Sequence, residues 1–406
     1  MKLKTLSPKL LISTSTKESI SMFSNILISG FLANKLKPDN FLTYTSIIFI
    51  VSSATQINRG VQFSVVKSSA HGKFQLSQPS FSLSRIALIE SVIWVLISPL
   101  IAHTLKLPIV PLLIAGFALP ITVCSAWVAG TLQSSQRNSE WQTWLTFSTL
   151  LQFPLLGIAI HFDLKMSFLL LCAFLGTFIS SCFYIARASK QFFKLRVSPI
   201  YFYSPGIFAS TLFLNYNLPV LTLRGIVPEG DLGKYTLLTF PFGVLVGFSS
   251  IFGSFLLSRS IKNADLYPSG YRIEWRPALL ILCLMSACGF LLKQLSPNLI
   301  PRTLGPSYSA DLNGTDIVVC VLAYSCWAIV YWISQSQMYR INIASNIFQI
   351  VILFFEIIVL LFFELTPIAV FLTHLVLGLT ALALLIYSMK DSNFLLRNLP
   401  RTKTAK

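Results

Sequence analysis

The chain has 406 residues, of which 54% are apolar or aromatic and only 11% are charged. A soluble domain carries about 25% charged residues, so this composition excludes a water-soluble globular protein and indicates that lipid is the main solvent. The net charge of +17 would suit a nucleic-acid-binding protein. In a membrane protein it indicates basic loops beside anionic lipid instead, and we expect no nucleic acid partner.

The apolar segments are about 20 residues long, which is the length of a helix that spans a bilayer. Strands of a membrane barrel would instead alternate strictly over about ten residues. We predict an all-α polytopic membrane protein of about 12 transmembrane helices. In chain order these helices lie near 15–34, 41–66, 84–105, 109–132, 142–162, 166–186, 205–225, 233–257, 276–295, 316–338, 344–363 and 366–388.

Lys and Arg are unequally distributed over the loops between these helices. When the helices alternate in direction, most of the 31 Lys and Arg residues fall on the side of the membrane that holds the N-terminus. Basic loops stay in the cytoplasm. We therefore predict cytoplasmic N- and C-termini and a multi-pass protein of the cell inner (cytoplasmic) membrane.

Two pairs of segments resemble each other at half the chain length. The segments 38–45 and 228–236 open the second and eighth predicted helices, and the segments 132–138 and 333–342 follow the fourth and tenth. Such a repeat predicts two pseudo-symmetric six-helix lobes that hold a substrate between them and work by alternating access. The predicted parts are an N-terminal lobe 1–190, a cytoplasmic connection 191–204, a C-terminal lobe 205–390 and a basic cytoplasmic tail 391–406.

Four short motifs carry a family resemblance. Segment 32–44 has small residues, a Pro-containing turn and an aromatic start, and the other motifs lie at 58–70, 130–137 and 304–310. At these residues the chain resembles the polysaccharide exporter and O-antigen flippase families of the multidrug/oligosaccharidyl-lipid/polysaccharide flippase superfamily. It departs from the family pattern at Leu42, where Gly is usual, and at Arg59, where an apolar residue is usual.

The resemblance implies a flippase that moves a lipid-diphosphate-linked oligosaccharide, an O-antigen or exopolysaccharide repeat unit, across the membrane. It implies the bilayer, this lipid-linked substrate and polysaccharide-assembly proteins as partners. One open alternative is an ion-coupled small-molecule or drug antiporter of the same superfamily. Another is a membrane-embedded glycan polymerase or acyltransferase. We expect no enzyme and no catalytic residue, because the predicted outer loops are too short for a catalytic set.

Arg59 is the sharpest single feature, because it lies well inside the second predicted helix. A central Arg costs about 2.5–3.5 kcal/mol on insertion scales, so it needs a partner or a water-filled cavity. Together with Gln56 and Gln62 it forms a polar stripe at helical spacing. We predict that the stripe faces the bundle interior and binds the substrate, since an Arg fork suits phosphate oxygens. The alternative is that Arg59 snorkels to the interface or forms a structural pair.

Other polar residues extend this candidate site. Asn215 and Asn217 on the seventh predicted helix and Tyr331 on the tenth are candidate substrate-binding residues, although Tyr331 also suits plain helix packing. Glu90 and Glu356 are candidate ion-coupling carboxylates. A structural ion pair with Arg59 is the alternative for Glu90, and Glu356 has no partner visible nearby in sequence.

The sequence contains no motif that is typical of a metal or cofactor site. The four His residues show no metal-ligand spacing, and there is no phosphate-binding loop. We predict no metal site and no cofactor, and we expect any driving force to come from an ion gradient or mass action.

Overall fold

The computed structural model describes most of the chain. The described residues are 24, 27–28, 30–36, 38–70, 81–134, 138–192, 196–197, 199–226, 239, 242–243, 245–246, 249, 276–304, 313–336, 343–362 and 366–398. Most of the first and eighth predicted helices lies outside these residues, as does the repeat segment 228–236. That half of the predicted repeat is therefore still a prediction.

The described elements are almost entirely helical. They are α2 (Pro38–Thr55), the 3-10 helix η1 (Gln56–Asn58), α3 (Arg59–Ala70), β1 (Phe81–Ser82), α4 (Leu83–Thr104), α5 (Ile109–Ala115), α6 (Ala118–Ser134), α7 (Asn138–His161), α8 (Met166–Phe192), β2 (Arg196–Val197), α9 (Pro199–Ile226), α11 (Arg276–Leu304), α12 (Gly314–Ser336), α13 (Ile343–Phe362) and α14 (Pro367–Asn398). The two short strands pair antiparallel. The all-α prediction is confirmed.

The helices have the length and polarity of membrane spans. Within the described ranges, six helices are long and apolar enough to cross a membrane, and three shorter apolar helices accompany them. On α4, the apolar residues Leu88, Leu96 and Leu100 are 65%, 72% and 70% exposed, whereas Glu90 and Ser98 lie on the buried face. Apolar residues outside and polar residues inside are what lipid requires, so the chain is a multi-pass membrane protein.

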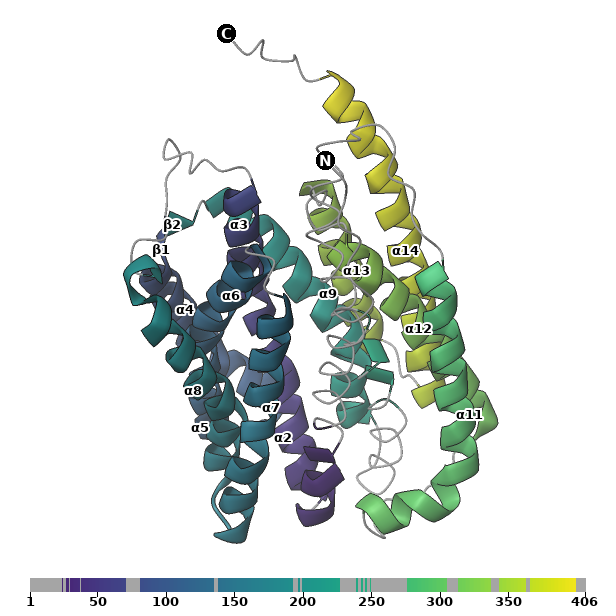
Figure 1. Cartoon of the computed structure of the whole chain (residues 1–406). Helices are drawn as coiled ribbons and strands as arrows, with labels where there is room; N and C mark the ends of the chain where they lie inside the picture. Colours follow the sequence, from purple (N-terminus) through teal and green to yellow (C-terminus); the bar gives the residue numbers. More distant parts are fainter. Residues whose placement is uncertain are drawn as a thin grey trace.

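Two groups of helices lie side by side in Figure 1. Helices α2 to α8 form one group and α11 to α14 form the other. Between them runs α9, which contacts α2, η1 and α3 on one side and α12, α13 and α14 on the other. The lobe boundaries at 190, 205 and 390 remain predictions; α8 ends at Phe192 and α9 begins at Pro199.

A glycine allows α9 to lie directly on the break between α2 and α3. A Cβ atom at Gly206 would come within 2.2 Å of the backbone oxygen of Ile57 in η1. One turn along α9, the Ser210 hydroxyl donates to the backbone oxygen of Ser53. Because η1 and α9 touch through backbone, the interlobe contact depends on a residue without a side chain.

Replacing Gly206 by Ala is therefore expected to destabilise the protein. The clash is with backbone, which cannot rotate away, and overpacking costs about 1–3 kcal/mol. Gly157→Ala in α7 is the matched control, because nothing lies within 4 Å of its added Cβ. The measurement is the thermal unfolding midpoint in detergent. It should fall for Gly206→Ala and hold or rise for Gly157→Ala, and equal midpoints would contradict the close contact.

Candidate functional site

The side chain of Arg59 is held at the start of α3 by two glutamines. Its Nε donates to Oε1 of Gln56 (3.1 Å) and its Nη1 donates to Oε1 of Gln62 (3.4 Å). Both partners are neutral, and within the described ranges no carboxylate pairs with Arg59. The guanidinium charge is thus positioned but not neutralised by those residues.

The predicted polar stripe does face the interior of the bundle. Gln62 is buried, and its Nε2 donates to Oε1 of Gln133 on α6 at 2.8 Å. The stripe residues Gln56 and Arg59 are half-buried. Helices α3 and α6 approach closely here because Gly130 faces the backbone of Gln62, where a Cβ would come within 2.8 Å. The hydrogen bond between Gln62 and Gln133 therefore fixes which face of α3 carries Arg59.

Arg59 and the candidate residue Tyr331 lie in different groups of helices but near each other. The Arg59 guanidinium interacts electrostatically with Tyr331 of α12. The Tyr331 ring is 2% exposed and meets the ring of Tyr216 on α9 edge-on, with centroids 5.6 Å apart. The structure thus brings the cation of the first group toward Tyr331 of the second group and its ring partner on α9.

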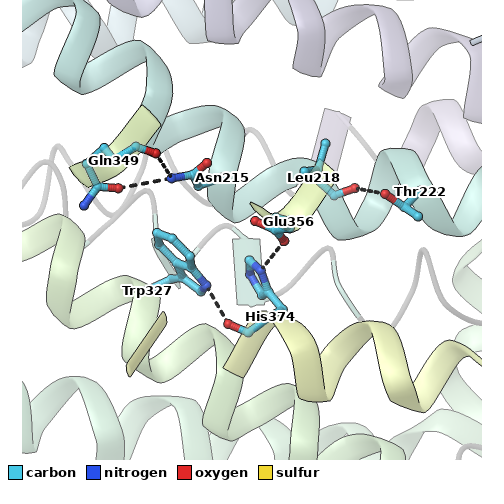
Figure 2. Close-up of polar contacts among 7 residues, drawn as sticks. All are labelled: Asn215, Leu218, Thr222, Trp327, Gln349, Glu356 and His374. Atoms are coloured by element: carbon cyan, nitrogen blue, oxygen red, sulfur yellow. Dashed lines mark hydrogen bonds and ion pairs between the residues drawn. The ribbon is translucent and has the colours of Figure 1, made fainter. Parts of the chain in front are cut away.

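Asn215 and Asn217 do not join Arg59. The Nδ2 of Asn215 donates to the backbone oxygen (3.3 Å) and the Oε1 (3.1 Å) of Gln349 on α13 (Figure 2). The Nδ2 of Asn217 donates to the backbone oxygen of Phe213 in its own helix at 2.8 Å. Both asparagines are buried, and Asn215 ties α9 to α13.

The alternative considered for Glu90, an ion pair with Arg59, is wrong. Glu90 instead accepts a hydrogen bond at its Oε2 from Nδ2 of Asn58, at 3.1 Å. Successive helical residues point about 100° apart. At η1 the neighbour of Arg59 therefore faces α4 and α6, while Arg59 points elsewhere.

Two fully buried ionisable groups among the described residues form a pair between α13 and α14. Nδ1 of His374 lies 3.0 Å from Oε1 of Glu356, and the side chains are 0% and 1% exposed. Figure 2 shows the two side chains pointing at each other, with Trp327 of α12 beside them. Trp327 Nε1 donates to the His374 backbone oxygen at 3.1 Å, and its ring stacks on the imidazole with centroids 5.1 Å apart.

Three buried polar atoms around this pair have no hydrogen-bond partner among the described residues. They are Oε2 of Glu356, Nε2 of His374 and the hydroxyl of Tyr324 on α12. Tyr324 interacts electrostatically with Cys320 of its own helix, with Tyr216 of α9 and with Glu356. In that part of the chain, no Lys or Arg pairs with Glu356. The cluster can therefore change its charge only by gaining or losing a proton.

The positions of Glu356 and His374 in the sequence could have predicted this pair, although their residue types could not. Glu356 and His374 are 18 residues apart and equally far from the connection between α13 and α14. Residues placed symmetrically about a tight helix hairpin lie at the same depth. Pairing by depth would have found His374.

Metal chemistry gains no support from these clusters. Where the structure describes the chain, no three His, Cys, Asp or Glu side chains gather to hold a metal ion. The expectations of no metal site, no cofactor and no catalytic residue remain predictions.

Solved structures share this arrangement over nearly the whole chain. A crystal structure of MATE in complex with MaL6 superposes with a TM-score of 0.61 at 13% identity, over 95% of this chain and 96% of that chain. The chain has the MATE transporter fold. The outward-facing conformation of a multidrug resistance MATE family transporter of the MOP superfamily matches it with a TM-score of 0.60 at 13% identity, over 95% of each chain.

A third structure with the MATE fold is a MOP superfamily transporter from Pyrococcus furiosus Vc1, whose reversed pocket polarity suggests a different function. It matches with a TM-score of 0.59 at 12% identity, over 94% of each chain. No family model and no curated protein matches the sequence. At this level of identity the matches show the fold alone, so the predicted superfamily and its flippase branch stay predictions.

Proposed function

We propose that the protein is a proton-coupled antiporter that exports a small molecule bearing an anionic group. The observation that carries this proposal is the Glu356–His374 pair, a buried carboxyl and imidazole 3.0 Å apart in a chain with the MATE fold. In this proposal Glu356 and His374 carry the proton, and Arg59 binds the anionic group of the solute.

The charge balance of the pair supports coupling. With one ring proton on His374 and an ionised Glu356, the pair carries a net charge of −1; a second proton makes it neutral. A net charge inside the membrane is costly without a partner, and no Lys or Arg among the described residues supplies one. A sealed pair therefore favours two protons, and contact with water at low proton concentration lets one leave.

Arg59 supports an anionic solute. It is half-buried, and the atoms that hold it are neutral amide oxygens. An Arg without a carboxylate partner in a low-dielectric site attracts carboxylate, sulfonate or phosphate groups. Tyr331 interacts electrostatically with Arg59 and packs against the ring of Tyr216. These two rings suit the apolar body of such a solute.

The charge of Arg59 also supports a second candidate function. A diphosphate is also an anion that Arg59 would bind, so the lipid-diphosphate-linked oligosaccharide flippase is the second candidate. On that proposal the partners are the inner-membrane bilayer, the lipid-linked substrate and polysaccharide-assembly proteins. The flippase proposal assigns no role to the Glu356–His374 pair, and we therefore favour the antiporter.

Vesicles with an acidic lumen distinguish the two functions. Purified protein is reconstituted, and two probes are followed in parallel: a sulfonated fluorophore outside and a fluorescent lipid-diphosphate sugar in the bilayer. The antiporter should accumulate the fluorophore while the lumen becomes more alkaline, and a protonophore, which collapses the pH gradient by itself, should stop the accumulation. Leaflet exchange of the lipid probe at a rate independent of the pH gradient, without fluorophore uptake, would favour the flippase.

A further inference from the structure

A chain of side-chain hydrogen bonds runs from Arg59 along α3 and across to α6. Arg59 Nη1 donates to Oε1 of Gln62 at 3.4 Å, and Nε2 of Gln62 donates to Oε1 of Gln133 at 2.8 Å. Gln62 and Gln133 are 6% and 4% exposed. Nε2 of Gln133 is buried and has no hydrogen-bond partner among the described residues. The chain of hydrogen bonds thus ends in a free donor inside the bundle.

The direction of this chain follows from the chemistry of its first member. A guanidinium has N–H donors and no acceptor, so Gln62 must turn its oxygen toward Arg59 and its amino group toward Gln133. Gln133 must then offer its own oxygen, because two amino groups that face each other make no hydrogen bond. The unpartnered atom of Gln133 is therefore a nitrogen with two hydrogens, which can only donate. Its partner has to be a hydrogen-bond acceptor.

The charge of the chain favours a negatively charged acceptor. The chain begins at a cation, and each hydrogen bond polarises the next donor. None of the three side chains is negative, and within the described ranges no carboxylate pairs with Arg59. An anionic oxygen forms shorter and stronger hydrogen bonds than a neutral acceptor does. Water is the competing occupant, and it would give Gln133 no influence on anion binding.

Gln133 lies close to the membrane face that the basic loops predict to be cytoplasmic. It is the penultimate residue of α6 (Ala118–Ser134), and the connection that follows α6 carries Arg137, one of the residues that predict a cytoplasmic loop. Arg59 is the first residue of α3, and Gln62 follows it by about one turn. A solute exported from the cytoplasm would therefore meet Gln133 before Arg59.

We propose that Gln133 is a specificity-determining residue that donates from Nε2 to an anionic oxygen of the solute, on the cytoplasmic side of Arg59. This inference rests on the proposed function, which supplies the anionic solute. The ligand chemistry is an oxyanion: a sulfonate, a carboxylate or a phosphate. Because Nε2 is buried in this conformation, the solute reaches it when the helices around the end of α6 move apart during alternating access.

The test is equilibrium binding of two probes, the sulfonated fluorophore and its neutral analogue, to the purified full-length protein in detergent at constant pH. Gln133→Met keeps the length of the side chain and removes the donor. It should weaken binding of the sulfonated probe by roughly 10-fold or more, as expected for a hydrogen bond to a charged group, and leave the neutral analogue unchanged. Equal affinity of wild type and Gln133→Met for the sulfonated probe would overturn the inference and leave water as the occupant.

Gln133→Glu separates ligand binding from a structural role and guards against loss of fold. Its carboxylate still accepts the hydrogen bond from Gln62, so a Gln133 that only holds Gln62 in place would tolerate this change. We expect it to lose binding of the sulfonated probe at least as strongly as Gln133→Met. The matched control is Gln152→Glu, which brings the same charge to a half-buried glutamine that packs against Gly176 of α8. Wild-type affinity in Gln133→Glu, or an equal loss in Gln152→Glu, would refute the assignment.

The lipid-diphosphate sugar distinguishes a failure of this inference from a failure of the proposed antiport. If the flippase is the true function, wild type binds the lipid probe and not the fluorophore, and Gln133→Met weakens binding of the lipid probe to the same extent. The antiport proposal then fails and the role of Gln133 stands. Binding of neither probe by wild type would overturn both.

Discussion

Glu356→Gln is expected to abolish transport driven by a pH gradient and to leave solute exchange intact. Glutamine keeps the size of the side chain and can accept the hydrogen bond at Oε1, but it cannot take up or release a proton. The buried pair would then hold a constant charge in every conformation. Uptake of the sulfonated fluorophore into acid-loaded vesicles should fall to the level of empty vesicles, while equilibrium exchange of the same fluorophore continues.

The control for this variant is Glu140→Gln, which removes an exposed carboxyl at the start of α7. Its gradient-driven uptake should match wild type. His374→Gln should behave like Glu356→Gln, because both partners share the proton. Wild-type accumulation by Glu356→Gln would show that the pair has only a structural role.

Arg59→Gln is expected to weaken binding of the anionic solute strongly. Hydrogen bonds to charged groups contribute about 1.5–3 kcal/mol, which corresponds to roughly 10- to 150-fold in affinity. A neutral analogue of the fluorophore should lose little, so the ratio of the two transport rates reports the charge preference. Arg59→Lys keeps the charge without the fork and should lie between the two.

The matched control for Arg59 is Arg85→Gln, because Arg85 lies exposed at the start of α4. A structural Arg59 would give a different pattern: a lower unfolding midpoint with the anionic-to-neutral ratio unchanged. That outcome would remove Arg59 from the binding site. The lipid-diphosphate sugar should show the same dependence on Arg59 if the flippase is the true function.

The helices followed closely from hydropathy where apolar runs end at polar residues. The spans predicted at 84–105 and 316–338 are α4 (Leu83–Thr104) and α12 (Gly314–Ser336). Lipid imposes one length on every span, so composition alone determines these helices.

Breaks within the spans did not follow from hydropathy. One helix was predicted at 109–132, but the structure has α5 and α6, separated at Gly116. The Trp94 side chain of α4 packs there, within 2.2 Å of where a Cβ of Gly116 would lie. The η1 break likewise lies where α9 meets the second span. Both breaks arise from tertiary contacts, which no local pattern contains.

The candidate site was predicted in part for the same reason. Isolation in an apolar run marked Arg59, Glu90 and Glu356 as residues that need an explanation. Asn58, the partner of Glu90, and His374, the partner of Glu356, are unremarkable in sequence, because an Asn or a His near a helix end has many ordinary roles. The hairpin geometry, which sets residues of successive helices at equal depth, selects His374, whereas Asn58 is selected only by the packing of η1 against α4.

The central claim is proton coupling through Glu356 and His374, and one measurement tests it most directly. Lumenal pH and fluorophore uptake are recorded together in vesicles that contain wild type, Glu356→Gln or Glu140→Gln protein. We expect wild type and Glu140→Gln to alkalinise an acidic lumen only while the fluorophore accumulates, and Glu356→Gln to do neither. Equal alkalinisation and uptake by all three proteins would contradict the account.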